Sequence, residues 1–345
     1  MNIRIVLLIG TIGGYLGAVA GCASTSNDGP VSPIPSTEAR TTQTPLPGVE
    51  AEELRQQAVQ TILTGSRSNQ ALLRMHAVEG AKSLPDRALP IVQLALEDEN
   101  PAVRFAALVT TGRLPLESLA FRAQRISNDP SQPGYVRAAA LYAAHRNGVD
   151  VDLSPLAEML WDRDERQRAN AALLLGLAGE RSAIPVLRDA AKAPMERSEP
   201  VQRELVRLQI YEALLNLGEE ASLKPLRVAA YSNQNEVRVL AVLMLGRAMD
   251  RSMEGNFVTF LPKDPVELRL AAAESLARLG SREGLPVMLE ASLLELATVR
   301  SQAAFALGQA YPQPAAARRL AELMRDPEPR VRLAAAAAVL EALDR

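Results

Sequence analysis

Few residues in this chain are of the types that carry out metal or acid–base catalysis. The sequence has two histidines, His76 and His145, which lie 69 positions apart, and one cysteine, Cys22. It has no Gly-rich phosphate loop after a strand, no zinc-ligand spacing and no Ser-His-Asp set. Carboxylates are plentiful, but they fall at expected turns and helix surfaces, where a solvated role is the default. The sequence therefore favours a non-catalytic protein with no metal and no cofactor.

Cys22 follows a segment with the features of a secretory signal. An apolar run from Ile5 to Ala20 is too short to predict a spanning helix, and a small-residue site follows it. The end of the run, Val19-Ala20-Gly21-Cys22, resembles the bacterial lipobox. This resemblance implies cleavage before Cys22, acylation of Cys22 and attachment to a membrane, since each buried methylene contributes about 0.8 kcal/mol. The alternatives are an ordinary signal peptide or one N-terminal anchor helix with an incidental cysteine.

The chain divides into four parts by composition. Residues 1–21 are the expected signal peptide, and residues 22–49 are a Pro/Ser/Thr-rich tether with too few apolar residues to order itself. Residues 50–65, rich in Glu and Gln, predict a polar capping helix of the kind that stacked repeats require. Residues 66–345 form a repeat array. The protein is expected to be an exported bacterial lipoprotein facing the periplasm or the cell surface.

The array is marked by an apolar residue, then Arg, then nearly always Ala three positions later. Its period of about 31 residues is typical of stacked repeats. One instance, Gln167-Arg168, lacks the apolar residue, and the step that follows it is eight residues longer than its neighbours, with the extra residues near 192–200. This insertion is expected to be a protruding loop. The repeat arginines are Arg74, Arg104, Arg137, Arg168, Arg207, Arg238, Arg269, Arg300 and Arg332.

Each repeat is expected to contain two helices. The first often has Pro near its start, where the missing amide costs nothing. The second begins at the arginine and often ends at Gly, as at Gly148 and Gly280. Ala occupies the third position after the arginine in eight of nine repeats, which predicts a close approach of neighbouring helices. The fold class is therefore all-α, an α-solenoid of about nine helix pairs. The final helix, Val331 to Leu343, lacks a polar cap and could make a contact, so the oligomeric state stays open.

The Asp-Pro turns, the Val-Arg pairs and the period resemble HEAT repeats, particularly the short form of phycobilisome lyases. The resemblance implies a structural ladder in which each arginine pairs with an acidic residue of the turn before it. The expected pairs are Arg104 with Asp98, Arg137 with Asp129, Arg168 with Asp162 or Asp164, Arg269 with Asp264, and Arg332 with Asp326. The HEAT-like deoxyhypusine hydroxylases carry His-Glu pairs, whereas Ala77 follows His76 and Arg146 follows His145 here. The sequence therefore argues against that activity.

The second helices of the repeats are expected to line a concave wall. Arginine beside aromatic and aliphatic side chains is typical of a protein-binding groove. The candidate partner-binding residues are Arg113, Tyr142, Arg146, Arg247, Arg278 and Phe305. We hypothesise a membrane-tethered scaffold that binds another envelope protein or peptide. With a net charge of −2 and no basic arm, nucleic acid is not expected as a partner.

Two other functions stay open. An enzyme or lyase accessory protein could hold a small ligand or chromophore near His145, Tyr142 and Trp161, in which case a closed pocket should surround these residues. A purely structural envelope lipoprotein is the third possibility.

Overall fold

The structure, a computed structural model, describes residues 48–195, 198–262 and 265–344. The signal peptide, Cys22 and nearly all of the tether lie outside the described residues. The described part of the chain contains helices and no strand, so the prediction of an all-α fold is confirmed.

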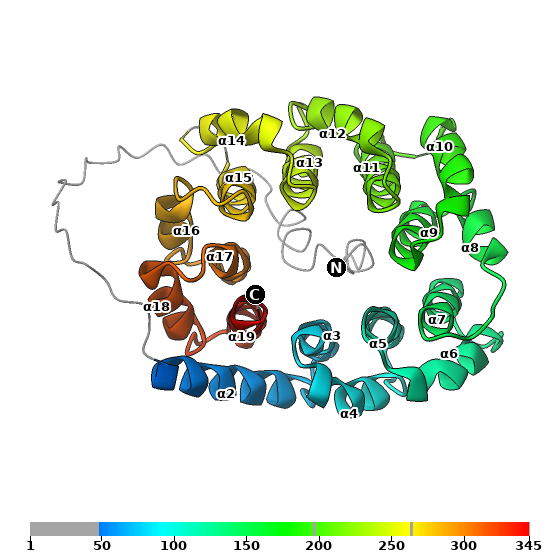
Figure 1. Cartoon of the computed structure of the whole chain (residues 1–345), viewed down its shortest axis with the longest axis horizontal. Coiled ribbons are helices and arrows are strands. Elements are labelled where there is room, and N and C mark those ends of the chain that lie inside the picture. The colour runs from blue at the N-terminus through cyan, green and yellow to red at the C-terminus, as the bar shows by residue number, and fades with distance from the viewer. Residues whose placement is uncertain (1–47, 196–197, 263–264, 345) are drawn as a thin grey trace, which may run out of the picture.

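Nine inner helices and nine outer helices alternate along the described chain (Figure 1). The inner helices are α3 (Ala71–Gly80), α5 (Pro101–Arg113), α7 (Gly134–Arg146), α9 (Glu165–Ala178), α11 (Pro200–Asn216), α13 (Asn235–Arg247), α15 (Val266–Arg278), α17 (Ala297–Gln309) and α19 (Pro329–Leu343). The outer helices are α2 (Gly48–Gly65), α4 (Pro85–Ala95), α6 (Ala120–Ser127), α8 (Ser154–Met159), α10 (Ile184–Lys192), α12 (Leu223–Ala229), α14 (Glu254–Phe260), α16 (Leu285–Ala291) and α18 (Pro314–Leu323). Short 3₁₀ turns connect several pairs.

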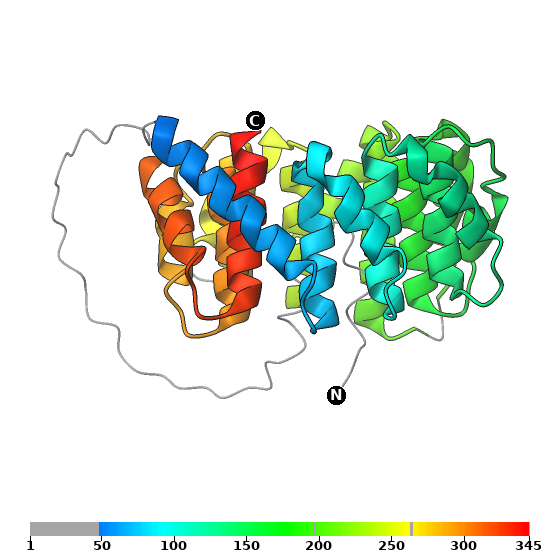
Figure 2. The same cartoon turned by 90° about the horizontal axis from the view of Figure 1, so that it is seen from below.

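The array closes into a ring. The last inner helix, α19, packs against both α2 and α3, the first two helices of the described chain. Figure 2 shows α2 running obliquely across α19 toward α3. Leu54, Ala58 and Ile62 of α2 are buried, and a Cβ on Gly65 would lie 3.1 Å from Cδ1 of Leu333 in α19. The expected polar cap, α2, therefore has a buried face that joins the two ends of the array. The final helix, α19, makes its contact with α2 and α3 of the same chain.

The helix boundaries follow from local chemistry. The side chain of Asn100 accepts a hydrogen bond from the Ala102 amide at the start of α5. Gly148, Gly179, Gly218 and Gly280 have φ between 83° and 91°, which confirms them as helix stops. In the repeat of Arg238 the equivalent residue is Met249, which adopts the same left-handed conformation with φ of 56°.

The Ala positions lie at the closest approach of neighbouring helices, as predicted. All nine residues in the third position after a repeat arginine, Ile210 included, are fully buried. A Cβ on Gly176 of α9 would lie 2.7 Å from the Cα of Ala213 in α11, which is closer than real atoms come. The small side chains thus let the backbones of successive inner helices pack directly against each other.

The 192–200 insertion does not form only a loop. The helix α11 begins at Pro200 and continues through Arg207, so it has 17 residues where the neighbouring α13 has 13. Part of the extra sequence therefore lengthens an inner helix at its N-terminus.

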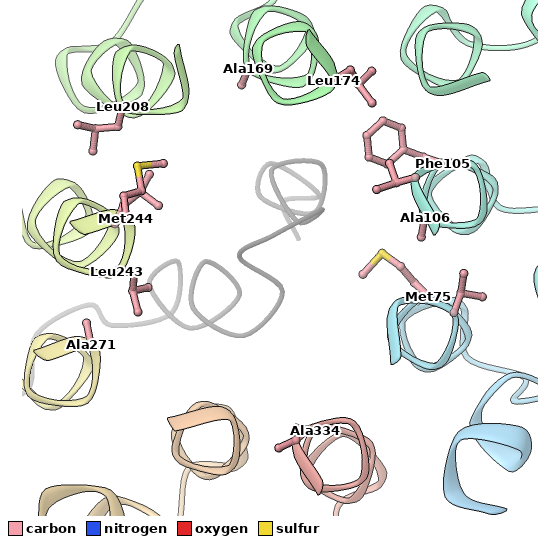
Figure 3. Close-up of a cluster of buried hydrophobic side chains, with 14 of the residues drawn as sticks. Met75, Phe105, Ala106, Ala169, Leu174, Leu208, Leu243, Met244, Ala271 and Ala334 are labelled. Carbon is pink, nitrogen blue, oxygen red and sulfur yellow. The ribbon is translucent and has the colours of Figure 1, made fainter. Parts of the chain in front are cut away.

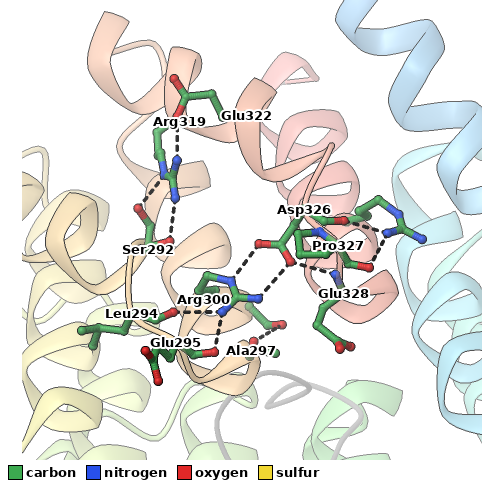
Figure 4. A network of polar contacts seen from close by, with 12 residues as sticks. Ser292, Leu294, Glu295, Ala297, Arg300, Arg319, Glu322, Asp326, Pro327 and Glu328 are labelled. Carbon is green, nitrogen blue, oxygen red and sulfur yellow. Dashed lines mark hydrogen bonds and ion pairs between the residues drawn. The ribbon is translucent and has the colours of Figure 1, made fainter.

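An arginine ladder is present, but its carboxylate partners differ from the prediction. The arginine pairs with the acidic residue of the following turn and not with that of the turn before it. Nε and Nη2 of Arg300 donate to the carboxylate of Asp326 in the following turn, at 2.8 and 3.0 Å (Figure 4). Nη1 of the same arginine donates to the carbonyls of Leu294 and Glu295 in its own turn, at 2.9 and 2.6 Å. Arg332, predicted to pair with the Asp326 carboxylate, instead donates to the backbone carbonyls of Asp326 and Pro327. The forked guanidinium therefore joins two repeats at once.

The same arrangement recurs at the start of the array. Arg74 donates to both carboxylate oxygens of Asp98, at 2.6 and 2.8 Å, and to the carbonyl of Ser68. Arg104 donates to the carbonyl of Asp98 and, one repeat further on, to the side chain of Gln132. The predicted Arg104–Asp98 side-chain pair is thus wrong, because Arg74 already occupies that carboxylate.

The other predicted pairs also differ. Arg168 reaches forward to Ser198, since Asp162 accepts the Asp164 amide and Asp164 caps α9. Arg269 pairs with Glu290 of the next repeat at 2.9 Å, and its expected partner Asp264 lies outside the described residues. Asp129 accepts hydrogen bonds from Ser131 and Gln132. Arg137 is exposed and makes no hydrogen bond or ion pair within the described chain.

Candidate partner-binding surface

One level of the inner face is apolar. Figure 3 draws Met75, Phe105, Leu243 and Ala334, which come from four different inner helices, among a cluster of buried hydrophobic side chains. Each of these side chains is at most 5% exposed. Met75 and Phe105 directly follow a repeat arginine, a position that the helical periodicity did not assign to the concave wall. Phe105 also packs its ring 5.8 Å from that of Tyr135.

A second level, at the C-terminal ends of the inner helices, is charged. Arg247 of α13 pairs with Glu212 of α11 at 2.6 Å, and Arg278 pairs with Glu274 within α15 at 3.0 Å. Lys82, after α3, pairs with Glu341 of α19 at 3.3 Å across the ring closure. We call this set the inner belt: Glu79, Lys82, Arg113, Arg146, Glu212, Arg247, Glu274, Arg278 and Glu341. Most of its charges neutralise one another within the protein.

The closing pair of the inner belt affects the ionisation of Glu341. Burial alone would raise the pKa of this carboxyl, but the charge of Lys82 and a hydrogen bond from Gln309 at 3.3 Å outweigh burial and hold the pKa below its usual value. The carboxylate is therefore stabilised in its charged form where the ring closes.

Arg113 is the exception in the inner belt. Its side chain is half-buried, and within the described residues it forms no ion pair and no hydrogen bond. Burial lowers its pKa, while Tyr142, Glu79 and Glu212 act in the opposite direction. Glu212 lies on α11, which faces α5 across the ring (Figure 1). Arg113 is thus a desolvated cation whose own surroundings compensate it only partly.

The structure separates the six predicted partner-binding residues into groups. Arg247 and Arg278 are held in internal ion pairs, so glutamates of the ring neutralise their charges. Tyr142 is 1% exposed and occupies the space beside Gly112, so the prediction that it is a surface residue is wrong. Gly112 lacks a side chain, and the Tyr142 ring fills the volume that this leaves.

Three of the predicted residues, Arg113, Arg146 and Phe305, are exposed or partly exposed and could contact a partner. Arg113 and Arg146 both act electrostatically on Tyr142, so the three residues lie together on α5 and α7. Arg146 is exposed and makes a single 3.4 Å hydrogen bond, from Nε to the carbonyl of Gly112. Phe305 of α17 is half-buried.

The residues proposed for an accessory or lyase site do not surround a common pocket. His145 forms a 3.1 Å contact with Glu180, Trp161 is 51% exposed, and Tyr142 is buried. A pocket of about 690 Å³ lies nearby between α6, α7 and α8, but none of these three residues lines it. His76 contacts Glu79 at 3.2 Å, and no cluster of three or more potential metal ligands occurs in the part of the chain that the structure describes.

None of the helices in residues 48–195, 198–262 and 265–344 combines the length and the apolar character needed to cross a bilayer. The apolar run before Cys22 lies outside these residues.

Comparison with known proteins finds a repeat family in the C-terminal part of the chain. Residues 256–341 match the family model of HEAT repeats, which confirms the predicted resemblance, and the remaining helix pairs of the ring repeat the same architecture. The described part of the chain is an α-solenoid, and its similarity to the HEAT family model covers residues 256–341. No curated protein matches the sequence.

Solved structures similar to this chain have low sequence identity. Human deoxyhypusine hydroxylase in complex with glycerol is 18% identical, with 86% of this chain and 98% of that chain covered and a TM-score of 0.38. The CpcE–CpcF phycocyanin lyase complex from Nostoc sp. PCC7120 is 16% identical, with 84% and 97% covered and a TM-score of 0.36. Kap121p bound to Nup53p is 13% identical, with 82% of this chain but 37% of Kap121p covered and a TM-score of 0.33. Likenesses at this level carry no information about ligand or partner.

Proposed function

We propose that this protein is a non-catalytic scaffold in a bacterial cell envelope that binds a segment of another envelope protein at the inner belt. The observation that supports this proposal is Arg113. The belt pairs Arg247 and Arg278 with glutamates of the ring, yet Arg113 stays half-buried and without an ion-pair partner among the described residues.

The chemistry of the belt favours an acidic partner segment. A carboxylate next to Arg113 would offset the cost of keeping a cation in a desolvated place. Arg146, exposed and on the neighbouring inner helix, adds a second forked donor on the same side of the ring.

The experiment introduces a photo-crosslinking amino acid in place of Phe305 in the native host, followed by mass spectrometry of the crosslinked protein. Arg113→Glu with Arg146→Glu should abolish the crosslink by reversing the charge, while helical circular dichroism and melting stay close to wild type. Arg247 and Arg278 should not be replaced, because their loss leaves Glu212 and Glu274 unpaired.

The matched control is Arg87→Glu with Arg181→Glu, which makes the same charge change at two exposed arginines outside the inner belt. This control should keep the crosslink. An unchanged crosslink in the Arg113/Arg146 variant would remove the inner belt from consideration.

The proposed scaffold is held on the membrane by acyl chains on Cys22, with the 22–49 tether between lipid and ring. The resemblance of Val19-Ala20-Gly21-Cys22 to the lipobox supports this part. Mass spectrometry of the mature protein should find a chain that begins at an acylated Cys22, and Cys22→Ser should release the ring from membranes. A mature protein that retains residues 1–21 would contradict the lipid anchor without affecting the inner-belt proposal.

A further inference from the structure

The pocket of about 690 Å³ lies between α6, α7 and α8, beside the shortest α-helix of the described chain. Gly148 ends α7 in the left-handed conformation, and residues 149–153 then run without helix until the Asp152 side chain accepts the amide of Ser154 at 2.8 Å. Only six residues of α8 follow, where the next outer helix, α10, has nine. The volume of the pocket lies in the range of roughly 300–1,000 Å³ found for ligand pockets.

Two departures from the repeat pattern meet in this pocket. Arg137 occupies the ladder position, but it is exposed and makes no hydrogen bond or ion pair with the described residues. Gln167 occupies the position before the next repeat arginine, where the other eight repeats have Val or Leu. Its Oε1 is buried and has no hydrogen-bond partner within the described chain, a condition that is costly unless something donates to it. Both residues depart from the pattern of the other repeats, and both line the same cavity.

The rest of the lining combines apolar and acidic groups. Leu141, Val151 and Met159 supply apolar surface. The single arginine faces four carboxylates, those of Asp150, Asp152, Glu158 and Asp162. Asp152 and Asp162 each also accept a backbone amide, so Asp150 and Glu158 are the carboxylates for which no hydrogen bond is present in the described structure.

We propose that this pocket binds an extended peptide segment of a partner protein through a lysine or arginine side chain. An extended backbone presents carbonyl acceptors that match the guanidinium of Arg137. It also presents amide donors that match Oε1 of Gln167 once the buried side-chain amide turns toward the pocket. The acidic lining accepts the basic side chain, and its aliphatic stem packs on Leu141 and Met159. This site is on the outer side of the ring and is independent of the inner belt.

The test uses the full chain in detergent and three fluorescein-labelled nonapeptides, Gly-Ser-Ala-Leu-X-Ala-Leu-Ser-Gly, with Lys, norleucine or Glu at X. Fluorescence anisotropy should give a Kd for the Lys peptide at least about tenfold lower than for norleucine, and no binding of the Glu peptide up to about 1 mM. Free spermidine should compete weakly, because it lacks the backbone groups that Arg137 and Gln167 recognise.

Four variants separate the two parts of the recognition. Gln167→Val restores the residue type of the other repeats, so the protein should melt at or above the wild-type temperature while affinity for the Lys peptide falls about tenfold.

Arg137→Ala should lower the affinities for the Lys and norleucine peptides by the same factor, because the Arg137 side chain contacts the peptide backbone. Glu158→Gln should reduce only the preference for Lys over norleucine. Asp189→Asn, an exposed carboxylate on α10 outside the pocket, should change nothing.

Three results would overturn the proposal: equal affinity for all three peptides or for none, an unchanged Kd in the folded Gln167→Val variant, or spermidine binding as tightly as the Lys peptide. The last would identify a general cation site.

Discussion

At the scale of single residues, the arginines show how one side chain type takes three roles. Arg300 joins two repeats because its own turn offers carbonyls and the next turn offers the Asp326 carboxylate. Arg113 lies on the inner belt without an ion-pair partner among the described residues, and Arg137 lines a pocket. The role depends on which acceptors lie within reach of the guanidinium, and neighbouring repeats supply those acceptors.

The Arg300–Asp326 pair should be a main contributor to stability at the C-terminal end of the array. Both side chains are largely buried, with 13% and 7% exposed. Asp326→Asn should lower the free energy of unfolding by about 3 kcal/mol, since it leaves Arg300 without a counter-charge. Urea unfolding followed by circular dichroism measures this. Glu322→Gln, at the more exposed partner of Arg319, should cost less than about 1 kcal/mol. Equal losses would show that burial of the ladder is unimportant.

The same pair predicts a pH dependence. Burial alone would raise the pKa of Asp326, but the hydrogen bonds from Arg300 and the Glu328 amide lower it below the 3.8 of a free side chain. Because the pKa is depressed in the folded state, the stabilisation is complete above the unfolded value and is lost as pH falls through the folded pKa. The stability difference between wild type and Asp326→Asn should thus be constant above about pH 5 and shrink in more acidic buffer. A difference that grows on acidification would contradict the ion pair.

At the scale of elements, the repeat depends on glycines and alanines that let inner helices touch. Gly176 of α9 faces the backbone of Ala213 in α11 and has no room for a methyl group, whereas Gly255 in the outer helix α14 has nothing within 4 Å of its missing Cβ. A glycine within a helix lowers stability relative to alanine. Close packing requires the glycine at Gly176, but nothing in the packing requires it at Gly255.

Replacing these two glycines by alanine should move stability in opposite directions. Gly176→Ala should destabilise the protein by about 1–3 kcal/mol through overpacking. Gly255→Ala should stabilise it by about 0.5–1 kcal/mol, the difference in helix propensity. Thermal melts of both variants measure the sign. Stabilisation by Gly176→Ala would show that α9 and α11 are further apart than described.

At the scale of the whole molecule, the ring removes the exposed end repeats that open solenoids must cap. Closure places α2 on α19 and α3, with ion pairs from Arg55 to Asp344 at 2.8 Å and from Lys82 to Glu341. These exposed pairs orient the contact, while the buried face of α2, including Ile62, supplies most of the stabilisation.

Opening the ring should be visible by hydrogen exchange. Ile62→Asp introduces a charge into the fully buried seam, so amides of α19 and α3 should exchange about tenfold faster or more, while those of α9 and α11 stay protected. Gln60→Asp, at an exposed position of the same helix, is the matched control and should behave like wild type. Uniform loss of protection around the ring would instead indicate that it unfolds as one cooperative unit.

The sequence by itself determined the repeat. Its period, the buried position three residues after each arginine, and the helix stops at residues such as Gly148 and Gly280 were all predicted, because each depends on contacts within a repeat or with its immediate neighbour. Only the tertiary structure decided that the ladder pairs Arg300 forward with Asp326, that Tyr142 is buried, that the pocket beside Arg137 exists, and that α2 meets α19. The contact between α2 and α19 depends on the rotation between successive helix pairs, which accumulates over nine repeats. The other three depend on how adjacent repeats pack against each other, and the sequence of one repeat does not specify that packing.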